Sequence, residues 1–156
     1  MRHMLQSRNF PKFFMRHQNA EGELNEFDPN FGQDFTFDLE QTQFDGKEGI
    51  RFRAINSPFF DGKEMYLRHK NFRILLEDQK SSPDPVLFLK DSTFFPRLGL
   101  KGPTPESPED GLSFEASNFP EHFIRHVNFH LFIGKKAGPD DHNFNPDATW
   151  IKRPPK

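Results

Sequence analysis

The sequence predicts an all-β fold, specifically a β-trefoil built from three pseudo-symmetric four-stranded repeats, and three observations lead to this prediction. The same composite motif occurs three times along the 156 residues. Apolar residues alternate with polar ones, as in half-buried strands. Fourteen Pro and ten Gly interrupt these runs, which suits short strands joined by many turns. We therefore place the repeats at about residues 3–44, 48–97 and 111–152 of a single domain that spans 1–156.

The repeated motif has two parts at a nearly constant spacing. An Asn-x-Pro element precedes an Arg-His pair, whose histidines are His17, His69 and His126. An Asp-x-Thr-aromatic run follows, and its aspartates are Asp34, Asp91 and Asp147. Self-similarity at a fixed period sets the architecture of a chain before any local prediction.

Each repeat is expected to contain four strands in the same order. The first strand alternates apolar and charged residues at 50–54 and 112–116, and Asn-x-Pro then ends it, since Pro fixes φ and lacks an N–H donor. The second strand covers 66–69 and 123–126. The third strand is expected to present Phe72, Ile74 and Leu76, matched by Phe129, Leu131 and Ile133. The Asp-x-Thr-aromatic segment opens the fourth strand.

The first repeat is the weakest copy, with only Leu5 and Ser7 in its first strand and small residues in its third. Polar, Pro-rich stretches at 78–85, 101–110 and 137–146 are predicted to be surface loops. No helix-period segment exceeds a turn or two. Four-stranded units that cannot bury their faces alone close best into a pseudo-threefold barrel capped by hairpins, which also removes exposed strand edges.

Composition limits the function classes. The 21 Phe dominate a hydrophobic content of only 33%, so phenylalanine is expected to fill most of the core. A net charge of −2 offers no basic footprint for nucleic acid. The lack of Cys excludes disulfides, thiolate zinc sites and a Cys nucleophile. No run approaches the ~20 apolar residues of a membrane span, and Met1–Leu5 lacks the apolar region of a signal peptide.

The motif as a whole resembles the arabinofuranose-binding domain, carbohydrate-binding module family 42. The resemblance covers about residues 5–151, and the third copy matches best, with Asn118-Phe119-Pro120, Arg125-His126 and Asp147-Ala148-Thr149-Trp150. It implies a β-trefoil, extracellular and attached to α-L-arabinofuranosidases, that binds L-arabinofuranose side chains of hemicelluloses such as arabinoxylan. A glycoside hydrolase is accordingly a candidate partner, whereas no cofactor, nucleic acid or membrane is expected.

The resemblance also implies the site residues, namely the His of the Arg-His pair and the Asp of the second motif. These are His69 with Asp91 and His126 with Asp147, and less strongly His17 with Asp34, where Phe35 replaces a small residue and the intervening loop is shorter. A carboxylate accepts hydrogen bonds from two vicinal hydroxyls, and an imidazole adds a polar atom and a flat face. Aromatic residues near such a pocket supply apolar contact, and the candidates are Phe72, Phe129, Tyr66 and Phe123.

Other repeated residues are interpreted structurally. Asn-x-Pro is a turn, and Thr36, Thr93 and Thr149 cap or pack turns. Alternation places the arginine before each His, at positions 16, 68 and 125, on the opposite face, where it ties down a neighbouring group or contacts ligand. The His–Asp pairs themselves remain open to a purely structural, hydrogen-bonded role.

A non-catalytic module is the expected function. Glycoside hydrolysis generally needs two carboxyl groups about 5–10 Å apart, whereas the repeated aspartates lie in symmetry-related positions, and no nucleophile recurs beside them. One repeated His per repeat gives no metal cluster. The chain is expected to be monomeric. The alternatives are a trefoil used for protein interaction or structure after loss of sugar binding, and recognition of a different glycan, such as a galactofuranose-like or pyranose unit.

Overall fold

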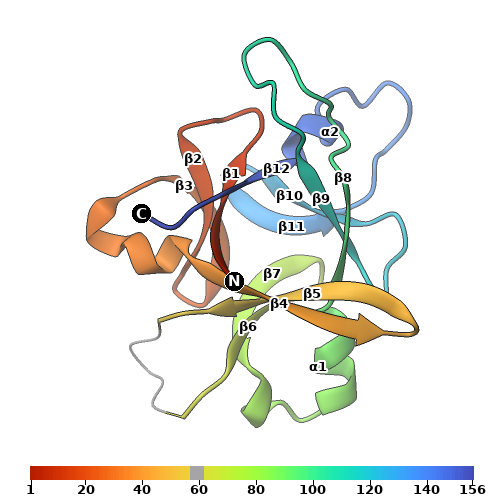
Figure 1. Ribbon diagram of the computed structural model, residues 1–156. Coiled ribbons are helices and arrows are strands. Elements are labelled where there is room, and N and C mark those ends of the chain that lie inside the picture. The colour runs from red at the N-terminus through yellow and green to blue at the C-terminus, as the bar shows by residue number, and fades with distance from the viewer. Residues whose placement is uncertain (57–61) are drawn as a thin grey trace.

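The computed structural model describes residues 1–56 and 62–156, so Ser57 and Pro58 of the second Asn-x-Pro element lie outside the described residues. The described residues form a β-trefoil of twelve strands (Figure 1). The strands are β1 (Arg2–Ser7), β2 (Phe13–Gln18), β3 (Glu21–Glu26), β4 (Phe37–Phe44), β5 (Lys47–Ala54), β6 (Met65–Lys70), β7 (Arg73–Asp78), β8 (Phe94–Leu98), β9 (Leu112–Ala116), β10 (Phe123–Val127), β11 (His130–Gly134) and β12 (Trp150–Arg153). The short helices are η1 (Pro29–Phe35), η2 (Gln79–Ser81), α1 (Pro85–Asp91) and α2 (Phe144–Asp147).

Six strands close into a barrel. β1 pairs with β4, β4 with β5, β5 with β8, β8 with β9, β9 with β12, and β12 returns to β1, always antiparallel. Each repeat contributes its first and fourth strands to this ring. Even the eroded first strand of repeat one pairs regularly with β12, with Leu5 and Ser7 both buried.

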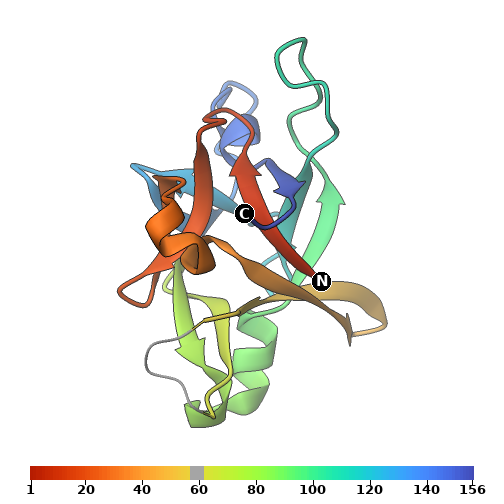
Figure 2. The same cartoon turned by 60° about the vertical axis from the view of Figure 1, so that its left-hand side comes forward.

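The second and third strands of each repeat form hairpins that cover one end of the barrel. The hairpins are β2–β3, β6–β7 and β10–β11, and β3, β7 and β11 pair with one another around the pseudo-threefold axis. The β8–β9 loop at 99–111, which contains the stretch 101–110 predicted to be a surface loop, stands clear of the barrel, and so does the β4–β5 hairpin (Figures 1 and 2).

Aromatic rings fill the barrel, as the composition predicts. Phe52 meets Phe94 and Phe114 edge to face, with ring centroids 5.7 and 5.0 Å apart. Edge-to-face pairs are the favoured aromatic geometry and bury a large apolar area each. Among the described residues, Phe contributes more fully buried hydrophobic side chains than any other type.

The turns that join the capping hairpins contradict one prediction. Phe72 and Phe129 do not open the third strands but occupy the second position of two-residue turns, after Asn71 and Asn128. Both residues of each turn have positive φ, with Phe72 at 67° and Phe129 at 65°. This is the type I′ geometry of hairpins, so the strands begin one residue later, at Arg73 and His130, and their first buried apolar residues are Ile74 and Leu131.

The Asp-x-Thr-aromatic segment also differs from its prediction. Asp91 and Asp147 end short helices and Asp34 lies inside one, so each strand begins only at the aromatic residue. The Thr hydroxyls do pack turns as predicted, because each donates to a carbonyl oxygen four residues earlier, from Thr36 to Gly32, Thr93 to Leu89 and Thr149 to Asn145. None of the helices in the described parts of the chain is long and apolar enough to cross a bilayer.

Candidate functional site

Four polar side chains come together at each of three places. A His and the Arg before it come from the second strand of one repeat, an Asp comes from the short helix of that repeat, and an Asn comes from the turn after the first strand of the next repeat. We name the three sets site 1 (Arg16, His17, Asp34, Asn56), site 2 (Arg68, His69, Asp91, Asn118) and site 3 (Arg125, His126, Asp147, Asn9).

The Asn connects the His to the Asp in every site. In site 3, Asn9 Nδ2 donates to Asp147 Oδ1 at 2.7 Å, and Asn9 Oδ1 lies 2.9 Å from His126 Nε2. The same two distances are 2.8 and 2.8 Å in site 2, and 2.7 and 3.0 Å in site 1. The His and Asp themselves are 3.5 to 3.9 Å apart. The structure thus brings together all three predicted His–Asp pairs.

These asparagines correct the interpretation of Asn-x-Pro as a structural turn only. Asn9, Asn56 and Asn118 recur unchanged, while the residue that follows them is Phe, Ser and Phe. A turn of this kind accepts Asp, Ser or Gly as readily as Asn. A side chain that donates a hydrogen bond to the Asp and accepts one from the His requires an amide. The unchanged Asn in all three repeats is therefore the feature of the sequence that could have revealed this role.

The arginines are not directed away from the sites, although alternation along the strand placed them on the opposite face. Arg16 Nη2 donates to Asp34 Oδ2 at 2.7 Å, and Arg125 Nη2 donates to Asp147 Oδ2 at 3.2 Å. Arg68 bonds Asp91 in the same way. In sites 1 and 2 the Arg Nε also donates to the carbonyl oxygen of the His that follows it, at 3.2 Å, so strand parity does not decide where this long side chain places its guanidinium. Each Arg holds one carboxylate oxygen, which leaves the other to the Asn.

The three histidines are buried, and burial lowers the pKa of His17, His69 and His126 from the ordinary value. The neighbouring Arg acts in the same direction, while the Asp opposes it. Each ring is therefore neutral at neutral pH. Because Nδ2 of the Asn faces the carboxylate, its Oδ1 faces the ring, which assigns the remaining ring proton to Nε2. The polar chain runs from His to Asn to Asp, and its negative charge is on the Asp.

Exposed Phe rings border sites 2 and 3. In site 3 the Phe10 ring lies 5.3 Å from His126 and 6.0 Å from Phe129. In site 2 the Phe119 ring lies 5.2 Å from His69, and Phe72 lies 5.6 Å from Phe119. All four Phe side chains are exposed. Phe72 and Phe129 were predicted neighbours, whereas Phe10 and Phe119 were missed because they belong to the Asn-x-Pro turn.

The other two aromatic candidates were wrong. Tyr66 is buried, with its hydroxyl donating to Glu40 at 2.6 Å and the Arg51 guanidinium over its ring. Phe123 packs its ring edge to face against Phe144. Burial therefore keeps Tyr66 from a ligand, and Phe123 is not among the residues that line the site 3 cleft.

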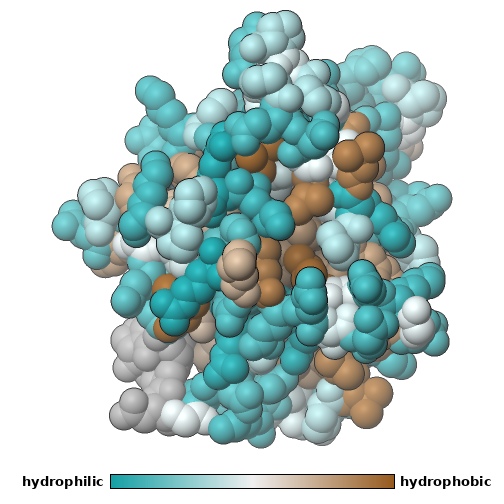
Figure 3. All heavy atoms as spheres, in the orientation of Figure 1, coloured by the Kyte–Doolittle hydropathy of each residue, from teal (hydrophilic) through white to brown (hydrophobic). Residues whose placement is uncertain are grey.

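Clefts open beside the His and the Asp of sites 1 and 3, and Arg68 of site 2 lines a further cleft of about 450 Å³. Site 3 borders a cleft of about 400 Å³ lined by its four polar residues together with Phe10 and Phe129. Site 1, the weaker candidate from sequence, borders a cleft of about 570 Å³. The face of the molecule shown in Figure 3 is largely hydrophilic, with separate apolar areas. No group of three or more His, Cys, Asp or Glu suited to a metal ion occurs within residues 1–56 and 62–156.

The conformation of Phe72 and Phe129 is costly. A non-Gly residue in the left-handed region costs about 1–2 kcal/mol, and the second position of a type I′ turn favours Gly. Both rings are nevertheless held there and exposed rather than buried. Strain of this kind persists at functional sites, so the rings point to a surface role.

The chain is similar to known arabinofuranosidases. Residues 59–152 match the family described as the alpha-L-arabinofuranosidase B (ABFB) domain. An arabinofuranosidase/B-xylosidase of Trichoderma koningii and an alpha-L-arabinofuranosidase of Hypocrea jecorina are each 28% identical over 95 residues, which cover 58% of this chain. The match covers only 17% of each of these curated relatives.

Solved structures show the same fold. An arabinofuranosidase complexed with arabinofuranosyl-alpha-1,2-xylobiose gives a TM-score of 0.77 at 18% identity over 97% of this chain and 30% of that one. An endo-β-galactosidase from Clostridium perfringens gives 0.66 at 11% identity, over 99% and 33%. The family match spans more than half of the chain, and this chain therefore belongs to the alpha-L-arabinofuranosidase B (ABFB) domain family.

Proposed function

We propose that this domain is a non-catalytic carbohydrate-binding module that recognises L-arabinofuranose side chains of a hemicellulose such as arabinoxylan. The observation that carries the proposal is the His–Asn–Asp chain at site 3, which ends in a carboxylate beside a cleft lined by two exposed Phe rings. Concave sites with a few convergent polar groups and an apolar wall are typical of ligand binding.

The carboxylate has the capacity that a sugar requires. In site 3, Asp147 accepts one bond at Oδ1 from Asn9 and one at Oδ2 from Arg125. An ionised carboxylate has about four lone-pair positions, so each oxygen keeps one for a hydroxyl. Two vicinal furanose hydroxyls then donate to one Asp, in charge-assisted hydrogen bonds, while the C–H face of the ring lies on Phe10 or Phe129.

Single sites of this size bind weakly. A pentose of about ten heavy atoms gains roughly 3–5 kcal/mol at about 0.3–0.5 kcal/mol per atom, which corresponds to a Kd near millimolar. Repeated sites on one domain raise the avidity for a branched polymer. The relatives named as arabinofuranosidases, of which the matched segment is a small part, support a partnership with a glycoside hydrolase, and we propose a monomeric module.

The test is a titration with arabinofuranosyl xylo-oligosaccharides, followed by amide chemical shifts in the wild type and in Asp147→Asn. Saturable shifts around Asn128 in the millimolar range, lost in the variant, are the expected result. The matched control is Asp45→Asn, at the tip of the β4–β5 hairpin, which should change nothing. If no arabinose-bearing ligand shifts any amide of the folded protein, the sugar proposal fails, and a protein-interaction role becomes the leading one.

A further inference from the structure

We infer that site 1 is a third working site with its own specificity, and that it takes a furanosyl unit carrying an aromatic acyl ester. The inference rests on the proposed sugar binding and extends it to a distinct ligand class. Three observations support it. The polar groups of site 1 are complete, an exposed aromatic ring lines the same cleft, and the volume of this cleft is larger than that of the cleft at site 3.

The polar end of site 1 is the most accessible of the three. The bonds between His17, Asn56 and Asp34 match those of the other sites. The Asp34 side chain keeps 19% of its surface exposed, compared with 8% for Asp91 and 16% for Asp147. A carboxylate that is assembled like the others and more exposed is competent to meet a sugar hydroxyl.

An exchange of two Phe residues distinguishes repeat one. Three residues before the site Asp, Phe88 and Phe144 are each 1% exposed and lie under the site Arg, with the guanidinium carbon 5.0 Å from the ring. The equivalent Phe31 is 54% exposed. In its place Phe35 packs under Arg16 at 4.9 Å.

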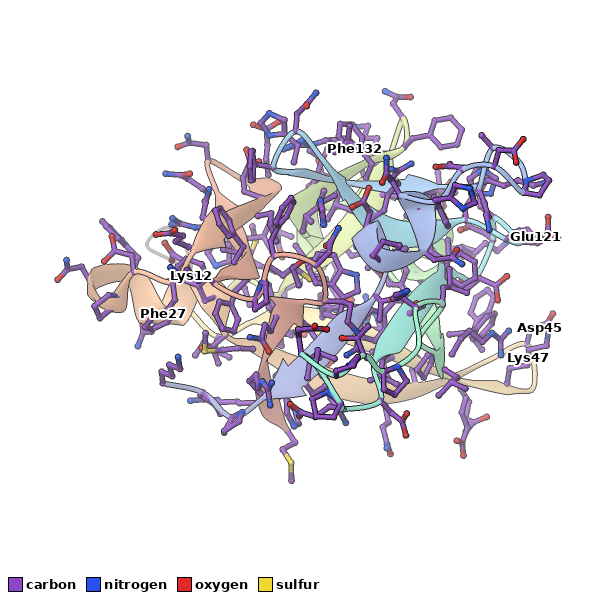
Figure 4. All side chains as sticks on the ribbon, turned by 90° about the horizontal axis from the view of Figure 1, so that it is seen from above. Lys12, Phe27, Asp45, Lys47, Glu121 and Phe132 are labelled. Atoms are coloured by element: carbon purple, nitrogen blue, oxygen red, sulfur yellow. The ribbon has the colours of Figure 1, made fainter. Side chains whose placement is uncertain are left out.

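Phe35 is held in that position by a small core of its own. It packs with Met4 and Phe14, and its ring lies 5.3 Å from Phe27. Phe27 and Lys12 mark this edge of the barrel in Figure 4, at the side opposite Asp45 and Lys47. In repeat one, Phe35 stands where the other repeats have a small residue after the site Asp. Because Phe35 takes the buried position under Arg16, Phe31 stays exposed and lines the site 1 cleft.

Site 1 also differs at the turn of its hairpin, where it lacks an aromatic ring. Ala20 occupies the hairpin position held by Phe72 and Phe129 in the other repeats, with the same left-handed backbone. The cleft beside site 1 has a volume of about 570 Å³, compared with about 400 Å³ at site 3. Beyond the polar groups of the two sites, the site 1 cleft is lined by Ala20, Phe31, Met65 and Leu76 together with Gln18, Asn19 and Lys63, and the site 3 cleft by Phe10, Val127 and Phe129 together with Asn128 and Asn143.

A ligand with two chemically different ends fits this cleft. The furanose hydroxyls meet Asp34 and His17, and an apolar planar group lies against Phe31. An aromatic ring stacks on Phe31 and contacts Met65, whose thioether favours aromatic neighbours. The Arg16 guanidinium, 5.7 Å from the Phe31 ring, adds a cation–π contact to the same surface.

The experiment compares methyl α-L-arabinofuranoside with its 5-O-feruloyl ester in amide chemical-shift titrations of the folded domain. The amides of Gln18 and Asn19 report on site 1, and those of Asn71 and Asn128 report on sites 2 and 3. The ester is expected to bind site 1 about tenfold more tightly than the plain glycoside, since one aromatic contact of about 1.4 kcal/mol gives a factor of ten. Sites 2 and 3 should bind the plain glycoside.

Two variants test the structural cause. Phe31→Ala removes an exposed ring, so the domain should fold normally and lose the tenfold preference at site 1. Ala20→Phe restores the ring of the other repeats, at a backbone position that Phe72 and Phe129 already occupy, and should exclude the ester. The matched control is Phe72→Ala, which should leave binding of the ester at site 1 unchanged.

The outcomes separate this inference from the proposed function. If the plain glycoside shifts Asn71 or Asn128 but the ester binds site 1 no more tightly than the glycoside does, the inference is overturned and the sugar module stands. The inference is also overturned if the preference survives Phe31→Ala. If neither ligand shifts any of the reporter amides, the proposed function itself fails.

Discussion

The ring of Phe129 stacks on that of Phe13, with centroids 5.3 Å apart and planes 30° from parallel, while the Phe129 backbone is held at φ 65°. Stacking on Phe13 and contact with Phe10 offset a backbone conformation that Gly would adopt without strain. A residue that is costly for the turn and exposed at a cleft therefore connects hairpin geometry with the candidate binding surface.

Replacement of Phe129 by Gly or Ala separates backbone strain from ring contacts. Both variants lose the ring and should bind arabinofuranosides several-fold more weakly at site 3. Phe129→Gly relieves the left-handed strain and should have a free energy of unfolding higher than that of Phe129→Ala by about 1 kcal/mol. Urea denaturation measures the difference, and equal stabilities of the two variants would refute the strain argument.

Asn9→Ala should weaken sugar binding at site 3 and leave site 1 unchanged, although Asn9 lies in the first repeat. The Asp147 carboxylate loses one donor and His126 loses its acceptor. Since hydrogen bonds to charged groups contribute about 1.5–3 kcal/mol, the affinity of site 3 should fall about tenfold or more. Asn118→Ala is the matched variant and should act on site 2 alone. A loss at site 1 in Asn9→Ala would contradict the geometry.

Arg68→Met should destabilise the fold strongly. Asp91 and Arg68 are both almost fully buried, and the substitution leaves the carboxylate without its cation. Breaking one side of a buried ion pair costs about 3–5 kcal/mol. Arg53→Met, which removes an exposed contact with Glu40 at 3.5 Å, is the control and should cost less than about 1 kcal/mol. Guanidinium denaturation of both variants checks the contrast.

Stability should fall on mild acidification. Burial lowers the folded-state pKa of His17, His69 and His126, so below the unfolded-state pKa of about 6.5 the unfolded chain binds more protons than the folded one. The contribution of these three histidines to the free energy of unfolding is then constant above about pH 7.5 and decreases as the pH drops through 6.5, by up to about 1.4 kcal/mol per pH unit for each histidine.

Urea denaturation between pH 7.5 and 5.5 measures this slope. His17→Gln keeps a side chain that donates to Asn56 but cannot titrate, and it should reduce the slope by about a third, since one of three equivalent groups is removed. A slope unchanged in His17→Gln would show that other groups cause the pH dependence.

The fold could be predicted from the sequence because packing follows periodicity. Alternation in 50–54 and 112–116 marks real barrel strands, and repetition of the pattern implies closure. The boundaries failed where local chemistry overrode alternation. Phe72 continues the apolar pattern of Ile74 and Leu76 in sequence, but the two-residue turn after Lys70 assigns it to the surface.

The sites were only half predictable. His69 and Asp91 could be paired because both recur within one repeat, whereas Asn118 joins them from the following repeat and carries the signature of a turn. The Phe31–Phe35 exchange was beyond a sequence reading, since both positions hold the same residue type and only packing decides which ring is buried.

Because each Asn comes from the repeat that follows its His and Asp, complete sites form at the junctions between repeats rather than within them. A closed ring of three repeats has three junctions, and an open pair has one. A fragment limited to residues 59–152 still encodes two His–Asp pairs but would complete only the one that meets Asn118. Circular permutation, with new ends in the β8–β9 loop and the β1 and β12 ends joined, would preserve all three. Closure of the ring therefore completes the binding sites at the same time as the fold. A duplicated repeat adds a His–Asp pair, but that pair becomes a complete site only when a following repeat supplies the Asn.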